Sequence, residues 1–312
     1  MTARGFEQLR TLALCVALLG ATCGARGAAT AERVSFESLD IDPVTGRPIT
    51  ISALYFRAEP IPSATMPAVV ALHGCGGMYG TTPAWRDRLT PRHQAMADLL
   101  VAEGYAVLFP DSFNPRGRRE ICTLKVGSQG ITQDNRRLDV LAALEFLRTR
   151  PEIDSTRVAL LGWSHGGSAT LASINRLHPV VAQFLAAQAP ADKFYRTAVA
   201  LYPGCIESMR TRFGYAPATA VSIFIGESDD WTSPKPCVAL GERMAAAHEP
   251  LQVRTYPDTY HGFDTPNMVR PLHLDVPNGV NPGKGVTVAP NPAARDDAYM
   301  RVKQQLRAAL AG

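Results

Sequence analysis

Two kinds of hydrophobic spacing alternate along the chain from about residue 32 onward. Short apolar runs are typical of strands that are covered on both faces, whereas helices repeat their apolar residues every three or four positions. The apolar runs are residues 68–73, 105–110, 157–161, 197–202, 220–225 and 251–256, and the helical segments are residues 91–103, 134–150, 236–248 and 295–310. This alternation predicts an α/β fold with a mostly parallel central sheet and helices on both faces.

The part of the chain before the first apolar run has a different pattern. Residues 34–39 and 49–56 alternate apolar and polar positions around the turn sequence DPVTG at residues 42–46, which predicts an N-terminal antiparallel hairpin. Three stretches show neither pattern and predict irregular structure, partly helical in the second: residues 111–133, 178–195 and 267–292. We expect residues 32–312 to form a single domain.

The first 31 residues have the pattern of a secretory signal peptide. Arg4 and Arg10 are basic, residues 11–21 are apolar, and the ATA sequence at residues 29–31 offers a cleavage site before Glu32. The apolar stretch is much shorter than the ~20 residues that a membrane-spanning helix needs. We therefore expect an exported protein, periplasmic or secreted, with no integral membrane segment after cleavage.

Charge and cysteine content restrict the class of protein. The formal net charge is +4 and no long basic run is present, so we expect no nucleic-acid partner. Four cysteines remain after the predicted cleavage, an even number that suits an oxidising compartment. Of three possible pairings we expect Cys75–Cys122 and Cys205–Cys237, because each would link loops that follow neighbouring predicted strands. Four buried thiols are the alternative.

A glycine-rich turn between a predicted strand and a predicted helix organises the candidate chemistry. Residues 161–167 (LGWSHGG) contain the pattern G-x-S-x-G, which in this context predicts a nucleophile elbow. Ser164 would project above the sheet edge, while Gly162 and Gly166 would let the strand and the helix approach closely. The backbone N–H of His165 would face a developing oxyanion. An ordinary strand-to-helix loop is the alternative.

The residues that would activate this serine follow it in the chain. A serine hydroxyl needs an adjacent base, and the order Ser, Asp or Glu, His is that of α/β-hydrolases. His261 follows a predicted strand and is the expected base, although a surface histidine is the bland alternative. Asp229 is the expected orienting acid, with the adjacent Asp230 as its competitor.

A second glycine-rich loop, HGCGG at residues 73–77, follows an early predicted strand. The second oxyanion donor of an α/β-hydrolase comes from such a loop, so we expect the N–H of Cys75, with Gly74 or Gly76 as alternatives. A glycine-rich turn without a role is the other interpretation. No H-E-x-x-H pattern, zinc-spaced cysteine and histidine cluster or P-loop is present, so we expect no metal and no cofactor.

Taken together, these residues resemble the dienelactone hydrolase family of α/β-hydrolases. The resemblance spans roughly residues 66–310 and rests on HGCGG at 73–77, PDSF at 110–113, GWSHGG at 162–167, GESD at 226–229 and residues 256–264. It implies an α/β-hydrolase fold and hydrolysis of a small ester or lactone without a cofactor. Dienelactone hydrolases proper have a cysteine nucleophile where this chain has Ser164 and a glutamate where it has Gly74, so an exported carboxylesterase is the better interpretation.

Four side chains are candidates for contact with the substrate. Arg116 and Arg118 lie in the long loop after residues 105–110 and could bind a substrate carboxylate, exposed loop arginines being the alternative. Trp163 and Trp231 adjoin the predicted catalytic residues. We expect hydrolysis of a small-molecule ester or lactone through an acyl-enzyme. A peptidase or polyesterase, or a non-catalytic binding protein on the same fold, are the alternatives.

Overall fold

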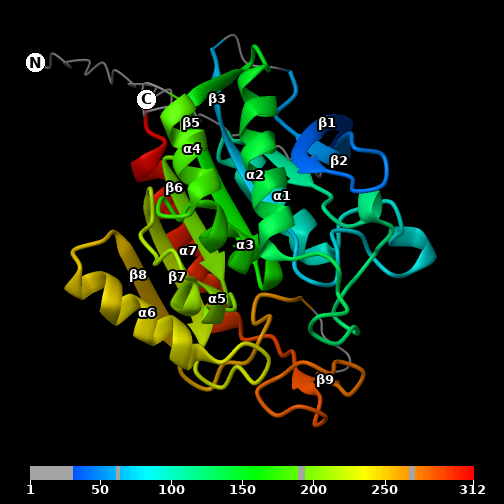
Figure 1. The fold of residues 1–312 in the computed structure, drawn as a ribbon, viewed down its shortest axis with the longest axis vertical. Coiled ribbons are helices and arrows are strands. Elements are labelled where there is room, and N and C mark those ends of the chain that lie inside the picture. Colours follow the sequence, from blue (N-terminus) through cyan, green and yellow to red (C-terminus); the bar gives the residue numbers. More distant parts are fainter. Residues whose placement is uncertain (1–30, 61–63, 189–193, 267–270) are drawn as a thin grey trace, which may run out of the picture.

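An eight-stranded sheet forms the centre of the molecule, with strand order β1-β2-β4-β3-β5-β6-β7-β8 (Figure 1). The computed structural model describes residues 31–60, 64–188, 194–266 and 271–312, so all of the predicted signal peptide but Ala31 lies outside the described residues. The strands are β1 (Ala31–Ile41), β2 (Pro48–Phe56), β3 (Met66–Leu72), β4 (Ala106–Pro110), β5 (Ile153–Trp163), β6 (Thr197–Leu201), β7 (Ala220–Gly226) and β8 (Leu251–Tyr256).

The directions of the strands follow the prediction from the sequence. Strands β3 to β8 run parallel to one another, whereas β1 pairs with β2, and β2 with β4, in the antiparallel direction. The mostly parallel sheet and the N-terminal antiparallel hairpin are thereby confirmed. The interior strands β3 and β4 are apolar throughout, and β6 is apolar after Thr197, because helices cover both faces of the sheet.

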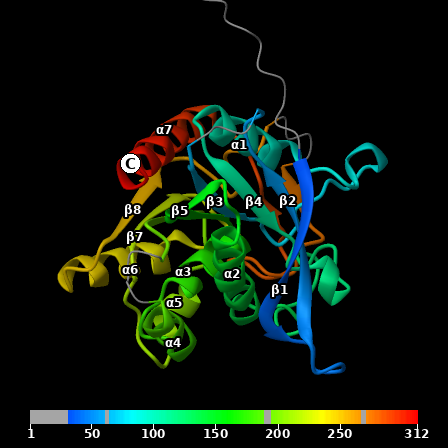
Figure 2. The same ribbon diagram turned by 90° about the horizontal axis from the view of Figure 1, so that it is seen from above.

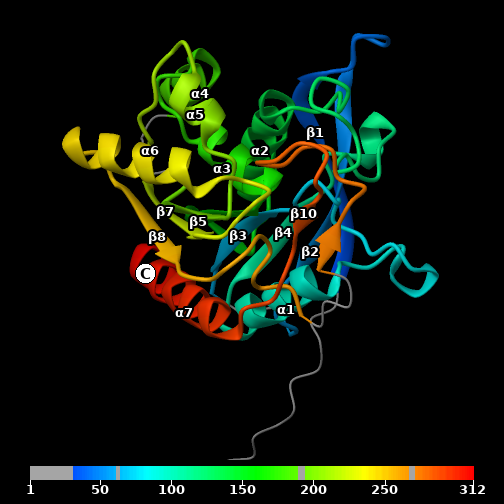
Figure 3. The ribbon, with the colours of Figure 1, turned by 90° about the horizontal axis from the view of Figure 1, so that it is seen from below.

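The helices form two layers on opposite faces of the sheet (Figures 2 and 3). Helices α1 and α7 cover one face, and α2, α3 and α6 cover the other, with α4 and α5 outside α3. Their bounds are α1 (Pro91–Ala102), α2 (Gln133–Arg148), α3 (His165–Ser173), α4 (Pro179–Ala187), α5 (Ile206–Arg210), α6 (Pro234–Ala246) and α7 (Pro292–Ala309). None of the helices in the described ranges is long and apolar enough to cross a membrane.

Local sequence explains where the helix next to the site begins. Thr132 and Asn135 form a capping box at the start of α2. The Thr132 side chain accepts from the backbone N–H of Asn135, and the Asn135 side chain accepts from the backbone N–H of Thr132. This helix also supports the N-terminal hairpin, because Phe36 of β1 stacks on Phe146 of α2 with ring centroids 5.2 Å apart. Helix α2 therefore holds the hairpin in place and lies beside the loops that follow β4 and β5.

Two features of the loops differ from the expectation. Residues 206–210 form the short helix α5, which the sequence did not predict. The expected irregular loop at residues 267–292 contains a small antiparallel pair, β9 (Leu272–His273) with β10 (Val286–Thr287), within its described part.

The structure contains disulfides between Cys75 and Cys122 and between Cys205 and Cys237, which is the expected pairing. Both disulfides lie beside loops at the carboxyl edge of the sheet.

Candidate active site

Ser164 lies on a strained turn between β5 and α3. Its backbone has φ 52° and ψ −118°, in a region that side chains other than glycine rarely adopt. A Cβ at Gly166 would overlap the carbonyl oxygen of Leu72, and one at Gly162 would overlap the carbonyl of Gly166. The two glycines of the G-x-S-x-G pattern are therefore required by close packing of β3, β5 and α3, as the elbow interpretation predicts.

His261 and Asp229 reach Ser164 from the loops after β8 and β7. The Ser164 hydroxyl lies 2.9 Å from Nε2 of His261, and Nδ1 of His261 lies 2.8 Å from Oδ2 of Asp229. The two loops are held together because the N–H of Ser228 donates to the carbonyl of Thr259 at 3.0 Å. The structure thus brings the three residues that were predicted from separate motifs into one hydrogen-bonded chain.

The neighbouring aspartates have different partners. Oδ1 of Asp229 accepts hydrogen bonds from the N–H groups of Trp231 and Thr232, which orients its Oδ2 toward His261. Asp230 points away and accepts from the N–H and the hydroxyl of Thr287 in β10, at 2.7 and 2.8 Å. Asp229, and not Asp230, is therefore the carboxylate that contacts the imidazole.

This arrangement can activate the serine. An ionised Asp229 has no proton to donate, so it accepts the Nδ1–H of His261 and leaves Nε2 free to accept the proton of the Ser164 hydroxyl. All three side chains are buried, with Ser164, at 8% exposure, the most accessible of them. The low exposure of His261 and Asp229 strengthens the electrostatic interaction between these two side chains.

Two backbone N–H groups lie unpaired beside the serine. In the described part of the chain, the N–H groups of His165 and Cys75 donate to no acceptor. His165 is the first residue of α3, where N–H groups have no partner within the helix. Cys75 is held by its disulfide to Cys122 and by the N–H of Ile121, which donates to its carbonyl at 2.8 Å.

A cavity of about 270 Å³ opens next to Ser164 and His261. The predicted residues Cys75 and Trp231 line it, and the Trp231 ring lies 4.8 Å from the His261 ring. The further lining residues that were not predicted as site residues from the sequence include Arg92, Tyr202, His273 and Val288. Of these four, only Tyr202 carried a usable signal, because it ends the predicted strand at residues 197–202, at the same sheet edge as Ser164.

Arg92 forms part of the cavity wall and is engaged by its neighbours. Its Nη1 donates to the hydroxyls of Tyr202 and Thr265 and lies 3.8 Å from Oδ1 of Asp264. These contacts hold the guanidinium in place and balance its charge with a buried carboxylate. They leave Arg92 as a fixed, polar part of the wall.

The structure corrects the expectations for the two loop arginines. Arg116 does not line the cavity, because its guanidinium bonds both oxygens of Asp139 at 2.9 Å, Asp40 at 2.7 Å and the carbonyl of Ser112. It ties β1 to α2. Arg118 is exposed and also lies outside the cavity lining.

Trp163 is a further correction. Its side chain is fully buried beneath the elbow, and its Nε1–H donates to Oδ2 of Asp264 at 2.9 Å. Trp163 ends β5, and its ring stacks nearly parallel to Phe109 of β4. The indole therefore supports the elbow from within the core and does not reach the cavity.

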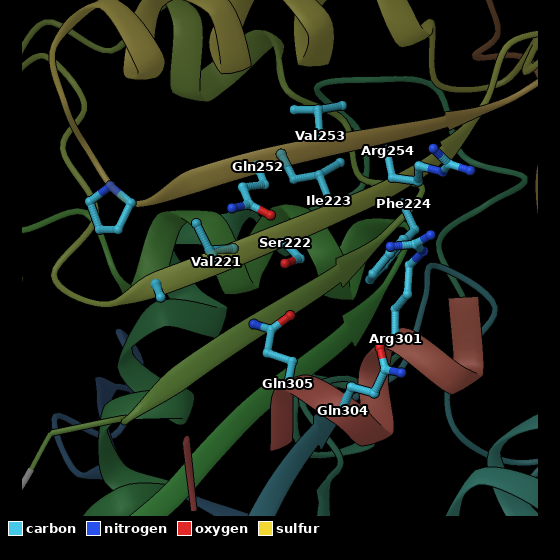
Figure 4. Close-up of a pocket in the computed structure, with 12 residues that line it drawn as sticks. Val221, Ser222, Ile223, Phe224, Gln252, Val253, Arg254, Arg301, Gln304 and Gln305 are labelled. Carbon is cyan, nitrogen blue, oxygen red and sulfur yellow. The ribbon is translucent and has the colours of Figure 1, made fainter. Parts of the chain in front are cut away.

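A second cavity, of about 500 Å³, lies between β7, β8 and α7 (Figure 4). Ser222, Gln252 and Gln305 are among its lining residues, and the described residues that line it include no histidine and no carboxylate. A serine without an adjacent base is a poor nucleophile, so this cavity lacks the chemistry found at Ser164. Among the described residues, no group of three or more His, Cys, Asp or Glu side chains is placed to hold a metal ion.

The sheet topology and the serine elbow at its carboxyl edge define an α/β-hydrolase. The family model described as "Dienelactone hydrolase family" matches residues 56–310, most of the chain. The chain therefore belongs to the dienelactone hydrolase family. The family resemblance inferred from the motifs is confirmed.

Individual relatives are more distant than the family match. The quorum-quenching protein AidA of Acinetobacter baumannii is 34% identical over 159 residues, which cover 48% of this chain and only 42% of that protein. A dienelactone hydrolase-like promiscuous phosphotriesterase from metagenomic libraries has a TM-score of 0.61 at 18% identity, covering 91% of this chain and 100% of that one. A thermophilic esterase, Est2 of Thermogutta terrifontis, has a TM-score of 0.58 at 15% identity, covering 90% and 94%. These structures show the shared fold.

Proposed function

We propose that this protein is an exported serine esterase that hydrolyses small carboxylic esters or lactones through an acyl-enzyme. The observation that carries the proposal is the hydrogen-bonded chain from Ser164 through His261 to Asp229, at 2.9 and 2.8 Å, on the wall of a cavity. Family membership supports ester hydrolysis as the reaction class. The predicted signal peptide and the two disulfides support export.

The geometry supports a two-step mechanism. Ser164 Oγ attacks the ester carbonyl carbon while its proton passes to Nε2 of His261, and Asp229 stabilises the resulting imidazolium. The negative charge that develops on the carbonyl oxygen is held by the unpaired N–H groups of His165 and Cys75. His261 then returns the proton to the leaving alkoxide, which departs as the alcohol of an open-chain ester or remains as the hydroxyl of the acyl group when a lactone is opened. A water molecule, deprotonated by His261, hydrolyses the acyl-enzyme and restores Ser164.

A fluorophosphonate probe, which reacts with activated serines, tests the proposal by intact mass. We expect one adduct on the wild type and none on Ser164→Ala, with open-chain aryl esters and lactones turned over only by the wild type. Ser222→Ala, which alters the serine of the second cavity, is the matched control and should be labelled like the wild type (Figure 4). A folded wild type that takes up no probe would contradict the proposed nucleophile and favour a binding protein.

A further inference from the structure

Arg136 of α2 is a buried cation that the mechanism above does not use. Its side chain is fully buried, and in the described chain no carboxylate lies within the 4.0 Å of an ion pair. Its neighbours differ, since Arg137 bonds Asp134 and Arg116 bonds Asp139. Burying an unpaired charge is costly, so an arginine here needs a reason beyond packing.

Among the described residues, the guanidinium makes one hydrogen bond, and its partner lies in the catalytic turn. Nη1 of Arg136 donates to Nδ1 of His165 at 3.0 Å, while Nε and Nη2 have no partner in the described part of the chain. The guanidinium also lies over the ring of Phe113, 5.3 Å from its centroid. The Phe113 ring also packs edge to face against two imidazoles. Its centroid lies 6.1 Å from that of His165 and 4.5 Å from that of His73.

Arg136 thus reaches both segments that carry the proposed oxyanion donors. It contacts His165 directly, and it contacts the loop that begins at His73 through the ring of Phe113. His165 carries one of the two unpaired N–H groups, and His73 begins the loop that holds Cys75. The Nδ1–H of His73 donates to the carbonyl of Gly74 at 2.8 Å, which fixes the orientation of that ring. One cation therefore lies beside two imidazoles near the proposed oxyanion site.

The charges of the cluster follow from its burial. Burial, and next the charge of Arg136, lower the pKa of His165 to about 3 and the pKa of His73 well below its usual range. Burial lowers the pKa of Arg136 to about 9, while the more distant Asp139 and Asp111 favour its charged form and Arg116 opposes it. At neutral pH the two histidines are uncharged and the arginine is a cation.

We propose that Arg136 is a positioning residue for ester hydrolysis. It holds the His165 imidazole, and with it the first turn of α3, so that the His165 N–H faces the oxyanion. Its fixed positive charge also stabilises the negative charge that develops there, because the buried surroundings screen it weakly. The guanidinium contacts neither the substrate nor the reacting atoms. This inference depends on the proposed function, since it assigns a role within that same reaction.

Substitution of Arg136, with a buried control on the same helix, tests this role. We expect Arg136→Met to lower kcat about tenfold to a hundredfold, less than loss of a direct oxyanion donor, with KM held within about threefold. Arg136→Lys, which keeps the charge, should recover part of the loss. Arg137→Met removes a buried arginine whose partners are Asp134, His178 and the Ala172 carbonyl, so it should change the melting temperature and leave kcat within about twofold.

A spectroscopic measurement separates positioning from a general loss of structure. The ¹⁵N shifts of the His165 ring should report the Nε2–H tautomer in the wild type and a changed tautomer in Arg136→Met. If Arg136→Met does not fold, His165→Leu removes the acceptor, keeps the backbone N–H, and should lower kcat in the same range.

Three results would overturn the proposal: a folded Arg136→Met with kcat within twofold of wild type, a lysine variant no better than the methionine variant, or an unchanged His165 tautomer. Probe labelling of wild-type Ser164 distinguishes the failures. A labelled wild type with an unaffected Arg136→Met overturns the role of Arg136 alone, whereas an unlabelled wild type overturns the proposed function as well.

Discussion

At the scale of single residues, the adjacent aspartates Asp229 and Asp230 provide a matched pair. Asp229 accepts from His261, whereas Asp230 accepts from Thr287. We expect Asp229→Asn to lower kcat about 10⁴-fold, because the amide cannot orient the imidazole as a carboxylate does. Asp230→Asn should keep kcat within about threefold, since it alters only a loop contact. Steady-state kinetics on an aryl ester measures both, and equal losses would contradict the assignment.

Asp264 is a second informative residue, which sequence spacing gave no reason to single out. Its fully buried carboxylate accepts from Trp163 Nε1–H and from the hydroxyls of Tyr202 and Tyr299. We expect Asp264→Leu to reduce the free energy of unfolding by about 3–5 kcal/mol, because it leaves buried donors and the Arg92 charge unpaired. Urea unfolding measures the loss, and exposed Asp258→Asn, expected within about 0.5 kcal/mol of wild type, is the control.

At the scale of elements, the two disulfides support different parts of the molecule. Cys205–Cys237 links the start of α5 to α6, away from the cavity, whereas Cys75–Cys122 holds the loop of a proposed oxyanion donor. We expect the double alanine variant of Cys205 and Cys237 to lose about 2–5 kcal/mol of stability with kcat little changed.

The double alanine variant of Cys75 and Cys122 should lower kcat at least about tenfold, since removal of one oxyanion donor costs about 10²–10³ in kcat and a displaced donor loses part of that. Thermal melting and kinetics on both variants check the contrast. Equal kcat values for the two variants would mean that the disulfide does not position the loop.

Elements were predictable from sequence where the signal is local. The apolar run before Ser164, the two glycines around it and the strand before His261 each act within a few residues, and the structure places them as expected. The side chains of Trp163 and Arg116 were misplaced because their partners, Asp264 and Asp139, are distant in the sequence. Helix α5 has five residues and too short a pattern to detect.

At the scale of the whole molecule, buried histidines make stability depend on pH. His73, His93 and His165 are fully or largely buried, and burial is the first cause that lowers the pKa of each, that of His165 from 6.5 to about 3. The unfolded chain binds protons at these rings below pH 6.5 and the folded chain does not, so stability falls as the pH decreases from about 6.5 toward 3.

At pH 5, His165 alone should cost the folded state about 2 kcal/mol. Urea unfolding at pH 7.5 and pH 5 measures the difference, and a variant of exposed His248, His248→Asn, should show the same pH dependence as the wild type. Equal stability at the two pH values would contradict this account.

The cavity beside Ser164 could not be predicted from the sequence, because Arg92, His273 and Val288 come from segments that meet only in the folded molecule.

The position of β3 in the sheet also determines when the chain can fold during its synthesis. This strand is made early, yet its two neighbours are β4 and β5, and β5 ends only at Trp163. Until the ribosome has passed that residue, one edge of an entirely apolar strand has no partner and is open to other chains. Nascent chains that stall before Ile153, and recombinant fragments that end there, are consequently expected to aggregate, so useful truncations must retain β5.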